Sequence, residues 1–262
     1  MNQMYIFNGS FSKSLPIVPI NRATYYGESF FTSFVVQDKS VCGIDAHFHR
    51  LQSSLNLFYP ELEKINQQEI INLLREHVPE KGRFKVRLTC FTNFEIDTRY
   101  DLIEIKKVEV LDTCGLKLIS KKFGNYSEID LKNLKLGQYA WENLYLKNNP
   151  GFDILRLSDD DLVHDLTKSN VLFFDGTNFV APLANVLQGT SLKLFREFHK
   201  KKFIQREIYY DEICEFESVF SINAVRLLQI VTQIDGKKFA NKNSDKYIRT
   251  FREYVDRVSK TL

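Results

Sequence analysis

Apolar and polar residues alternate in several short runs along the first part of the chain, which is the pattern of half-buried strands. "MYIFNGSF" contains one such run with a turn at Asn8-Gly9, and "SFFTSFVVQDKSVCG" predicts a hairpin that turns at Asp38-Lys39. "RFKVRLTCF" and "LIEIKKVEVL" alternate in the same way. We expect these runs to form strands of one sheet.

Between the hairpin and the later strands, apolar residues recur at the three-to-four spacing of a helix. This spacing is seen at Phe48, Leu51, Leu55 and Phe58. It predicts a helix over 45–59, capped by Asp45, and a second helix covers 66–77. Strands and helices together predict a small N-terminal α+β domain over residues 1–112.

The second part mixes short β-rich runs with helices. A strand is predicted at "GLKLIS", a helix over 132–147, a hairpin turn at Gly176 with Asn178, and a helix after Gly189. Further strands are expected in "DILRLS", "LVHDLT", "NVLFFDGTNFVAP", "IQREIYY" and "SVFSINAVRLLQIVTQIDGKKF", a short helix in "DEICEFE" and a closing amphipathic helix in "SDKYIRTFREYVDRVSKTL". These elements predict a larger C-terminal domain over 113–262.

Composition narrows the class of protein. Hydrophobic residues make up 44% and charged residues 26%, which indicates a globular chain, and the net charge of +3 gives no reason to expect nucleic acid or an anionic membrane as partner. No run approaches about 18 apolar residues, and the N-terminus lacks the pattern of a signal peptide. The four cysteines are scattered, without a CxxC pair. We therefore expect a cytoplasmic protein without a zinc site or a disulfide framework.

The segment "VLQGTSLKLF" places Gly-Thr-Ser directly before a predicted helix. Free N–H groups at the positive end of a helix, with two hydroxyls beside them, form a site for an anion. Gly189, Thr190 and Ser191 are therefore candidate phosphate ligands. The alternative is an ordinary helix cap by Thr190 or Ser191.

Two other segments carry candidates of opposite charge. In "HFHRL", His47 and Arg50 are three apart and share a helix face, so an inward-pointing Arg50 could hold a phosphate; a solvated helix face is the alternative. His47 and His49 project to different faces, which argues against zinc. In "LVHDLTKSN", Asp165 could pair with a buried cation or serve a turn, and His164 is expected to be structural or exposed.

The stretch "LKNLKLGQY" adds two lysines, Lys132 and Lys135. A cofactor that combines an aldehyde, a pyridine ring and a phosphate needs an amine, an acid for the ring nitrogen, and an arginine with a helix N-terminus for the phosphate. The chain supplies these four groups in the order Arg50, a lysine, Asp165 and the Gly-Thr-Ser segment.

These segments resemble those of the class IV aminotransferases, the pyridoxal-phosphate enzymes of fold type IV, and within them the aminodeoxychorismate lyases. The similarity spans nearly the whole chain, in "NRATYYGESFFTSFVV", "AHFHRL", "LVHDLTKSNVLFF", "VAPLANVLQGTS" and "SINAVRLLQIVTQIDGKKF". It implies a two-domain fold of mixed α/β (α+β) type, with a small N-terminal domain and a larger, β-barrel-like C-terminal domain. It also implies pyridoxal 5′-phosphate (PLP) as cofactor, an amino-acid-like substrate and a homodimer.

The resemblance assigns roles to the cofactor-binding candidates. Arg50 is implied to bind the phosphate, together with the backbone at Gly189, Thr190 and Ser191. Asp165 is implied to contact the pyridine nitrogen, and Asn223 to lie near the phosphate.

The resemblance also distinguishes between the lysines. In the lyases the lysine that binds the cofactor covalently is followed by x-Leu-Asn and lies about 33 positions before the acid. Lys132 is followed by Asn133-Leu134 and lies 33 positions before Asp165 (165 − 132), whereas Lys135 lies only 30 before it. Lys121 and Lys122 precede "FGNY", which is superficially similar to a branched-chain aminotransferase motif, but they are too far from the acid. Lys132 is therefore the predicted catalytic lysine.

For the substrate, Thr32 and Arg87 are implied as candidate ligands of carboxylates, and Tyr25 as a candidate pocket residue. An exposed strand position is the alternative for Arg87, and core packing for the tyrosine. The implied reaction is that of the lyase, which releases pyruvate and 4-aminobenzoate from 4-amino-4-deoxychorismate. Transamination of a branched-chain or D-amino acid is the alternative on the same fold, and Thr32 favours the lyase because branched-chain enzymes usually have Glu there.

The sequence departs from the family pattern at three places. The acid is usually Glu, and Asp165 is shorter by one methylene. Leu192 stands where the phosphate segment usually has Arg, and Glu28-Ser29 stand where Asp-Gly is usual. The changes at Asp165 and Leu192 leave open a third possibility, a relative that has kept the fold without the activity.

Overall fold

A computed structural model describes residues 3–14, 16, 20–108, 115–123, 136–183 and 186–262 of the chain. The described residues form two compact units, one made of residues 3–108 with Val258–Leu262 and the other of residues 115–123 with Gly137–Arg257. The two units are described separately below.

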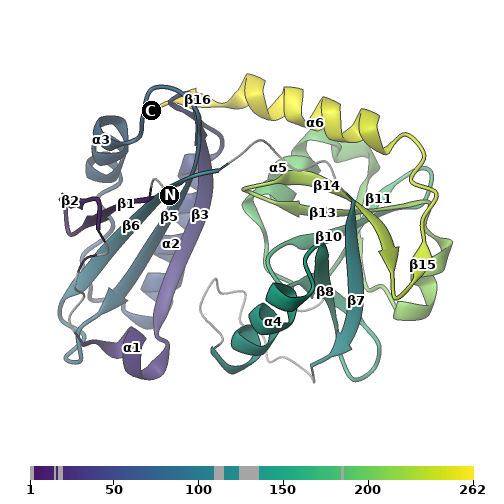
Figure 1. The fold of residues 1–262 in the computed structure, drawn as a ribbon, viewed down its shortest axis with the longest axis horizontal. Coiled ribbons are helices and arrows are strands. Elements are labelled where there is room, and N and C mark those ends of the chain that lie inside the picture. Colours follow the sequence, from purple (N-terminus) through teal and green to yellow (C-terminus); the bar gives the residue numbers. More distant parts are fainter. Residues whose placement is uncertain (1–2, 15, 17–19, 109–114, 124–135, 184–185) are drawn as a thin grey trace. The chain divides into compact units, whose positions relative to one another are not determined.

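The first unit is built on an antiparallel sheet of seven strands (Figure 1). The strands are β1 Gln3–Phe7, β2 Ser10–Ser12, β3 Ser29–Gln37, β4 Ser40–Val41, β5 Arg83–Thr92, β6 Arg99–Lys107 and β16 Lys260–Thr261, in the order β16-β4-β3-β5-β6-β1-β2. Both predicted turns are confirmed. Asn8 and Gly9 have φ of 44° and 79°, and Asp38 and Lys39 have φ of 48° and 62°, which is the left-handed pair that a two-residue hairpin requires.

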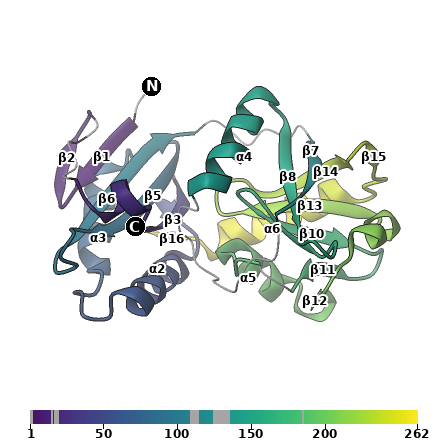
Figure 2. The same cartoon turned by 90° about the horizontal axis from the view of Figure 1, so that it is seen from below.

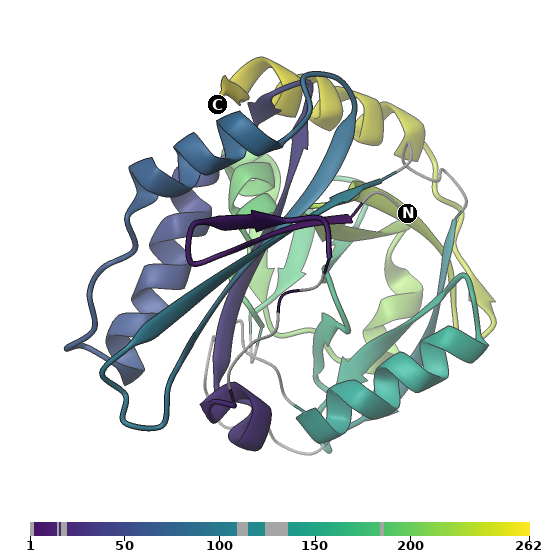
Figure 3. The same cartoon turned by 60° about the vertical axis from the view of Figure 1, so that its left-hand side comes forward.

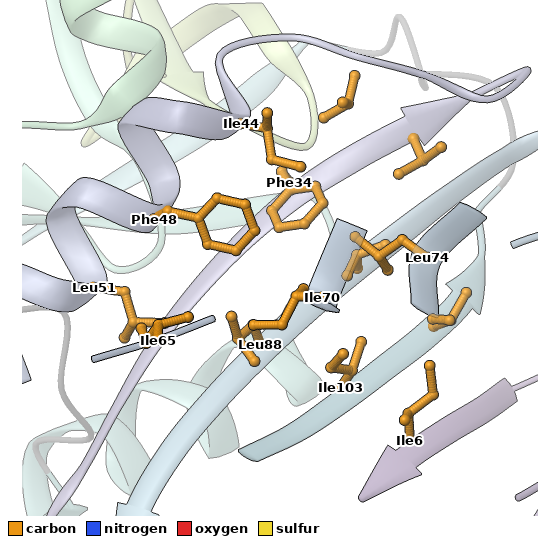
Figure 4. Close-up of a cluster of buried hydrophobic side chains, with 14 of the residues drawn as sticks. Ile6, Phe34, Ile44, Phe48, Leu51, Ile65, Ile70, Leu74, Leu88 and Ile103 are labelled. Carbon is orange, nitrogen blue, oxygen red and sulfur yellow. The ribbon is translucent and has the colours of Figure 1, made fainter. Parts of the chain in front are cut away.

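Two predicted helices cover one face of this sheet (Figures 3 and 4). They are α2 Ile44–Phe58 and α3 Gln67–His77. Their apolar faces bury Phe48, Leu51, Leu55, Ile70 and Leu74 against Ile6, Phe34, Leu88 and Ile103 of the strands. Burying each such side chain contributes roughly 1.5–3 kcal/mol, so this cluster holds the helices in place. The cap prediction at Asp45 was wrong: Gly43 is the N-cap of α2, and Asp45 lies in the first turn.

The second unit is built on a mixed sheet with the strand order β12-β11-β10-β13-β14-β7-β8-β9, and β15 beside β14. The strands are β7 Leu116–Lys122, β8 Phe152–Leu157, β9 Val163–Leu166, β10 Asn170–Phe174, β11 Phe179–Pro182, β12 Phe203–Arg206, β13 Ser218–Asn223, β14 Leu227–Ile234 and β15 Lys237–Lys238. Pairs β11–β12, β14–β7 and β7–β8 are parallel. The sheet curls so far that its two end strands, β9 and β12, approach each other. The Val163 N–H on β9 donates to the carbonyl of Ile208, two residues after β12, at 2.8 Å. This agrees with the predicted barrel-like character.

Three helices belong to this unit: α4 Leu136–Asn148, α5 Thr190–Phe198 and α6 Ser244–Val258. Helices α5 and α6 lie side by side (Figure 2). They contact each other through an aromatic cluster in which the ring centroids of Phe195 and Phe251 are 5.0 Å apart. Two short 3-10 helices, η1 Lys200–Lys202 and η2 Tyr210–Glu215, flank β12. The first residues of the helix predicted over 132–147 lie outside the described residues.

Two features differ from the sequence-based expectations. The amphipathic pattern extends the closing helix to the end of the chain, but Lys260–Thr261 form β16, which pairs with β4 of the first unit. The pattern also gives no sign of a short helix, α1 Arg22–Tyr26, which Asn21 caps and Gly27 ends with φ of 69°. Its five residues are too few to carry a helical hydrophobic period.

Candidate functional site

A buried carboxylate lies in the second unit, on strand β9. Asp165 is 9% exposed and every residue of its strand is buried, so the turn alternative was wrong. The Asn170 side-chain amide donates to both carboxylate oxygens, at 2.9 and 3.0 Å, and the Leu187 N–H donates to one of them at 2.9 Å. These two donors are neutral, and they fix the position of the carboxylate. His164, beside it, is also buried.

Gly189 packs directly against the residue that orients Asp165. The Asn170 amide also donates to the Leu187 carbonyl at 2.7 Å, which ties β10 to the segment before α5. A Cβ at Gly189 would lie 2.0 Å from Asn170 Oδ1, a distance that no side chain tolerates. The backbone there has φ of −59°, which any residue adopts, so glycine is required for space.

Helix α5 begins at Gly189 without a side-chain cap. Its N-cap is Gly189 itself, so the predicted alternative of a cap by Thr190 or Ser191 was wrong; both are the first helical residues. Backbone N–H groups at the positive end of a helix suit an anion such as phosphate. Leu192, where the family usually has Arg, is buried in the core.

Asn223 joins the same network from the end of β13. Its side-chain amide donates to Ser169 Oγ at 2.8 Å, and Ser169 directly precedes Asn170. Its Oδ1 accepts from the N–H groups of Val225 and Arg226, at 2.9 and 2.7 Å, which fixes the turn between β13 and β14. The structure thus links Asp165, Gly189 and Asn223, which are far apart in the sequence, through Asn170 and its neighbour.

The residues present fit a pyridine ring that carries a phosphate. The buried Asp165 carboxylate suits a protonated ring nitrogen, because an opposite charge beside it favours the charged form of both groups. A helix start without a side-chain cap, at a glycine that admits no Cβ, suits a phosphate group.

In the first unit, three predicted residues meet. Thr32 on β3 is fully buried, and its hydroxyl lies 2.7 Å from His47 Nδ1 and accepts a hydrogen bond from Arg50 Nη2 at 2.9 Å. His47 and Arg50 share a face of α2 as predicted, but His47 is buried rather than part of a solvated face. Thr32 lies on the face of β3 that the helices cover, because it is two residues from Phe30 and from Phe34, and residues two apart on a strand share a face.

Arg87, the other predicted carboxylate ligand, faces the opposite side of this sheet. It pairs with Ser33, whereas Leu88 pairs with Thr32, and neighbouring residues of a strand point to opposite faces. Its guanidinium lies 3.9 Å from the centre of the Phe31 ring and its Nε 3.7 Å from a Glu104 oxygen. The structure therefore does not bring Thr32 and Arg87 together.

Tyr25 lies on α1 and is 65% exposed, with its ring 5.4 Å from that of Phe94. The predicted catalytic lysine, Lys132, lies outside the described residues.

None of the helices in the described ranges is long and apolar enough to cross a membrane. Within those same ranges, no cluster of three or more His, Cys, Asp or Glu side chains suits a metal ion.

Sequence reasoning missed two groups of residues. Asn170 stands in the quoted "TKSNVLFF", but nothing in the pattern indicated that it orients Asp165.

The second group lies in the first unit. Arg22 makes a bidentate ion pair with Glu28, at 2.6 and 2.7 Å, and the Tyr59 hydroxyl donates to the same carboxylate at 2.7 Å. The Arg22 hydrogen bonds hold the pKa of Glu28 below its usual value. The Glu that replaces the usual Asp thus reaches an arginine six residues before it.

Comparison with known proteins places this arrangement in a family. The sequence model of the family described as amino-transferase class IV matches residues 29–234. The chain belongs to this family. That confirms the resemblance found in the sequence and the predicted fold, and PLP is the cofactor of this family. Among curated protein sequences, none matches.

Several solved structures share the fold. A hypothetical aminotransferase from Mycobacterium tuberculosis in its PLP-bound form has a TM-score of 0.82 and 15% identity, over 96% of this chain and 98% of that one. A candidate branched-chain amino acid aminotransferase from Thermotoga maritima has a TM-score of 0.80 and 14% identity, over 97% of this chain and 96% of that one. A candidate 4-amino-4-deoxychorismate lyase from Legionella pneumophila has 0.75 and 16%, over 92% and 96%.

Proposed function

We propose that this chain binds PLP and is an aminodeoxychorismate lyase. The observation that carries the cofactor assignment is the cluster in which Asn170 and the Leu187 N–H fix the buried Asp165 carboxylate beside the uncapped start of α5. The family of the chain supports the same cofactor.

Each residue has a defined part in this proposal. Lys132 would hold the cofactor covalently, and its ε-amine would act as the base for the proton on the substrate carbon next to the nitrogen. Asp165 keeps a proton on the pyridine nitrogen through its fixed carboxylate. When bound, PLP supplies the electron sink for the carbon that loses its proton.

The phosphate is assigned to a separate set of groups. Arg50 contributes a charged, bidentate donor, and Gly189, Thr190 and Ser191 contribute backbone N–H groups at the start of α5. Asn223 fixes the turn beside this segment through Ser169. Because backbone groups do not depend on side-chain identity, phosphate binding survives the loss of the usual arginine at Leu192.

The lyase reaction is favoured by the residue at position 32. The Thr32 side chain is neutral and bonded to Arg50, whereas a Glu there, usual in branched-chain enzymes, would bring a negative charge to that arginine. The fold shared with the candidate lyase from Legionella pneumophila is consistent with this reaction. The substrate proposed is 4-amino-4-deoxychorismate, and the products are 4-aminobenzoate and pyruvate.

The test is an assay with enzymatically generated 4-amino-4-deoxychorismate and PLP-loaded protein. We expect 4-aminobenzoate and pyruvate in equal amounts, and none of either from Lys132→Ala. A PLP-loaded protein that forms neither product would refute the lyase assignment.

Transamination of a branched-chain or D-amino acid is the second candidate. It is supported by the fold shared with the candidate branched-chain enzyme from Thermotoga maritima. If it holds, protein mixed with such an amino acid and 2-oxoglutarate will form glutamate and the matching 2-oxo acid, while 4-aminobenzoate is absent.

We also infer that the chain works as a homodimer of two-domain subunits, with domains of residues 1–112 and 113–262. The resemblance named Thr32, Arg87 and Tyr25 as candidate substrate residues, and Arg87 and Tyr25 stay proposed as such. Since Thr32 and Arg87 lie on opposite faces of one sheet, we expect one of them at most to contact a given carboxylate. A sedimentation measurement that gives a single 30.7 kDa species would contradict the dimer.

A further inference from the structure

The buried contacts around Thr32 form a directed chain of hydrogen bonds. A threonine hydroxyl has one hydrogen to donate and two lone pairs to accept with. Arg50 can only donate, so its 2.9 Å bond occupies a lone pair of Thr32 Oγ1. The hydroxyl hydrogen then needs an acceptor, because Thr32 is fully buried.

His47 Nδ1, 2.7 Å away, is the acceptor that meets this need. It accepts only when the imidazole is neutral with its proton on Nε2, so the chain runs from Arg50 to Thr32 to His47. The His47 ring packs against Phe34, with ring centroids 5.3 Å apart, which fixes its orientation in the core. A rigid imidazole therefore orients the Thr32 hydroxyl, and the hydroxyl in turn accepts from the guanidinium.

Regular secondary structure holds both Thr32 and His47 in place. Thr32 is fixed in the long β3–β5 ladder, and His47 lies one turn before Arg50 on α2. A flexible arginine side chain loses rotamer freedom when it binds an anion, and a side chain already held by a buried partner loses less. The bond to Thr32 thus restricts the conformations of the Arg50 side chain before a ligand binds.

We propose that Thr32 and His47 are positioning residues that preorient Arg50 for the phosphate of PLP, and that Thr32 itself does not contact the substrate. This inference rests on the proposed role of Arg50 as a phosphate ligand. It reassigns Thr32, which the sequence placed among the substrate residues. The effect belongs to the phosphate alone, so it distinguishes PLP from pyridoxal, which has the same ring and aldehyde but no phosphate.

The experiment measures the dissociation constants of PLP and pyridoxal for the full-length protein and its variants, by absorbance titration. For Thr32→Val, which keeps the shape and removes the hydroxyl, we expect PLP to bind about 10-fold more weakly while pyridoxal changes less than about 2-fold. Thr32→Ser, which keeps the hydroxyl, should bind PLP like the wild type. Both Thr32→Val and His47→Leu should raise the PLP-to-pyridoxal ratio, defined as the dissociation constant of PLP divided by that of pyridoxal.

The neighbouring strand offers a matched control. Thr89 also accepts a hydrogen bond from an arginine, Arg87, at 3.3 Å, but on the opposite face of the sheet. Thr89→Val should leave the PLP-to-pyridoxal ratio unchanged. A variant that is merely misfolded weakens both ligands equally, so the ratio separates positioning from general damage.

The outcomes also separate this inference from the one on which it rests. If Arg50→Met raises the ratio of the PLP dissociation constant to the pyridoxal dissociation constant and Thr32→Val does not, the positioning role is overturned while Arg50 keeps its assignment. If the wild type binds no PLP, or Arg50→Met leaves the ratio unchanged, the assignment of Arg50 is overturned and the positioning role with it.

Discussion

The contact between Gly189 and Asn170 allows a quantitative prediction. In Gly189→Ala the new Cβ would lie 2.0 Å from Asn170 Oδ1, so the Asn170 amide must move by about 1 Å or more to reach an ordinary contact. The movement breaks its bonds to the Asp165 carboxylate and to the Leu187 carbonyl. A bond to a charged group contributes about 2 kcal/mol and a neutral one about 1, so the unfolding free energy should fall by about 3 kcal/mol.

A double-mutant cycle tests this cause directly. In an Asn170→Ala background the opposing oxygen is absent, and the remaining neighbour, Leu192 Cβ, lies at an ordinary 3.7 Å. Adding Gly189→Ala there should cost less than about 1 kcal/mol, because φ of −59° suits alanine. We expect a coupling of about 2 kcal/mol between the two positions.

The assay is urea unfolding followed by tryptophan fluorescence. Trp141 is the one tryptophan of the chain and lies on α4, in the same unit as Gly189, so its signal reports on this unit. PLP affinity, measured in parallel, should fall in Gly189→Ala as Asp165 loses its orientation. If Gly189→Ala costs the same in both backgrounds, the contact does not set the role of the glycine and the reasoning is refuted.

Further predictions concern the second unit. His199 packs among Phe179, Phe195 and Phe198, and burial lowers its pKa from 6.5 to about 4. The neutral imidazole therefore contributes its full stabilisation above pH 6.5, and this contribution to the free energy of unfolding is lost as the pH falls toward 4. Between pH 7 and 4.5 the wild type should lose about 1–2 kcal/mol more unfolding free energy than His199→Phe, after a discount for partial exposure, and equal losses in pH-dependent urea unfolding would contradict this. The side chain of Glu142 on α4 is fully buried and makes a bidentate pair with Arg156 on β8, at 2.8 and 2.6 Å. Glu142→Gln should therefore lower the unfolding free energy by about 3 kcal/mol, and Glu142→Leu combined with Arg156→Met should recover most of it; a double variant as unstable as the single one would count against this reasoning.

Most strands and helices could be predicted because their hydrophobic periods are long. The hairpin at Asp38-Lys39 and the helices over Ile44–Phe58 and Gln67–His77 follow from alternation, helical spacing and turn residues, all of which are local. Strand β16 could not be found in this way. Its two residues follow an amphipathic helix directly, and only the distant partner β4 makes them a strand.

The site shows the same division. The types and order of the charged groups in the sequence indicated Arg50, Asp165 and the Gly-Thr-Ser segment. Asn170, which holds Asp165, and the bond between Thr32 and Arg50 depend on which faces meet in the folded units, and a single sequence does not contain that information. For the same reason the sequence grouped Thr32 with Arg87, although the pleat of one sheet sends them to opposite faces.

The central claim is that PLP is held by one particular lysine of this chain. The most direct measurement is borohydride reduction of the PLP-loaded protein, followed by digestion and mass mapping of the pyridoxyl group. The account predicts the label on Lys132, in full stoichiometry and absent from Lys132→Ala. A label on Lys135, Lys121 or Lys122, or no labelled peptide at all, would contradict it.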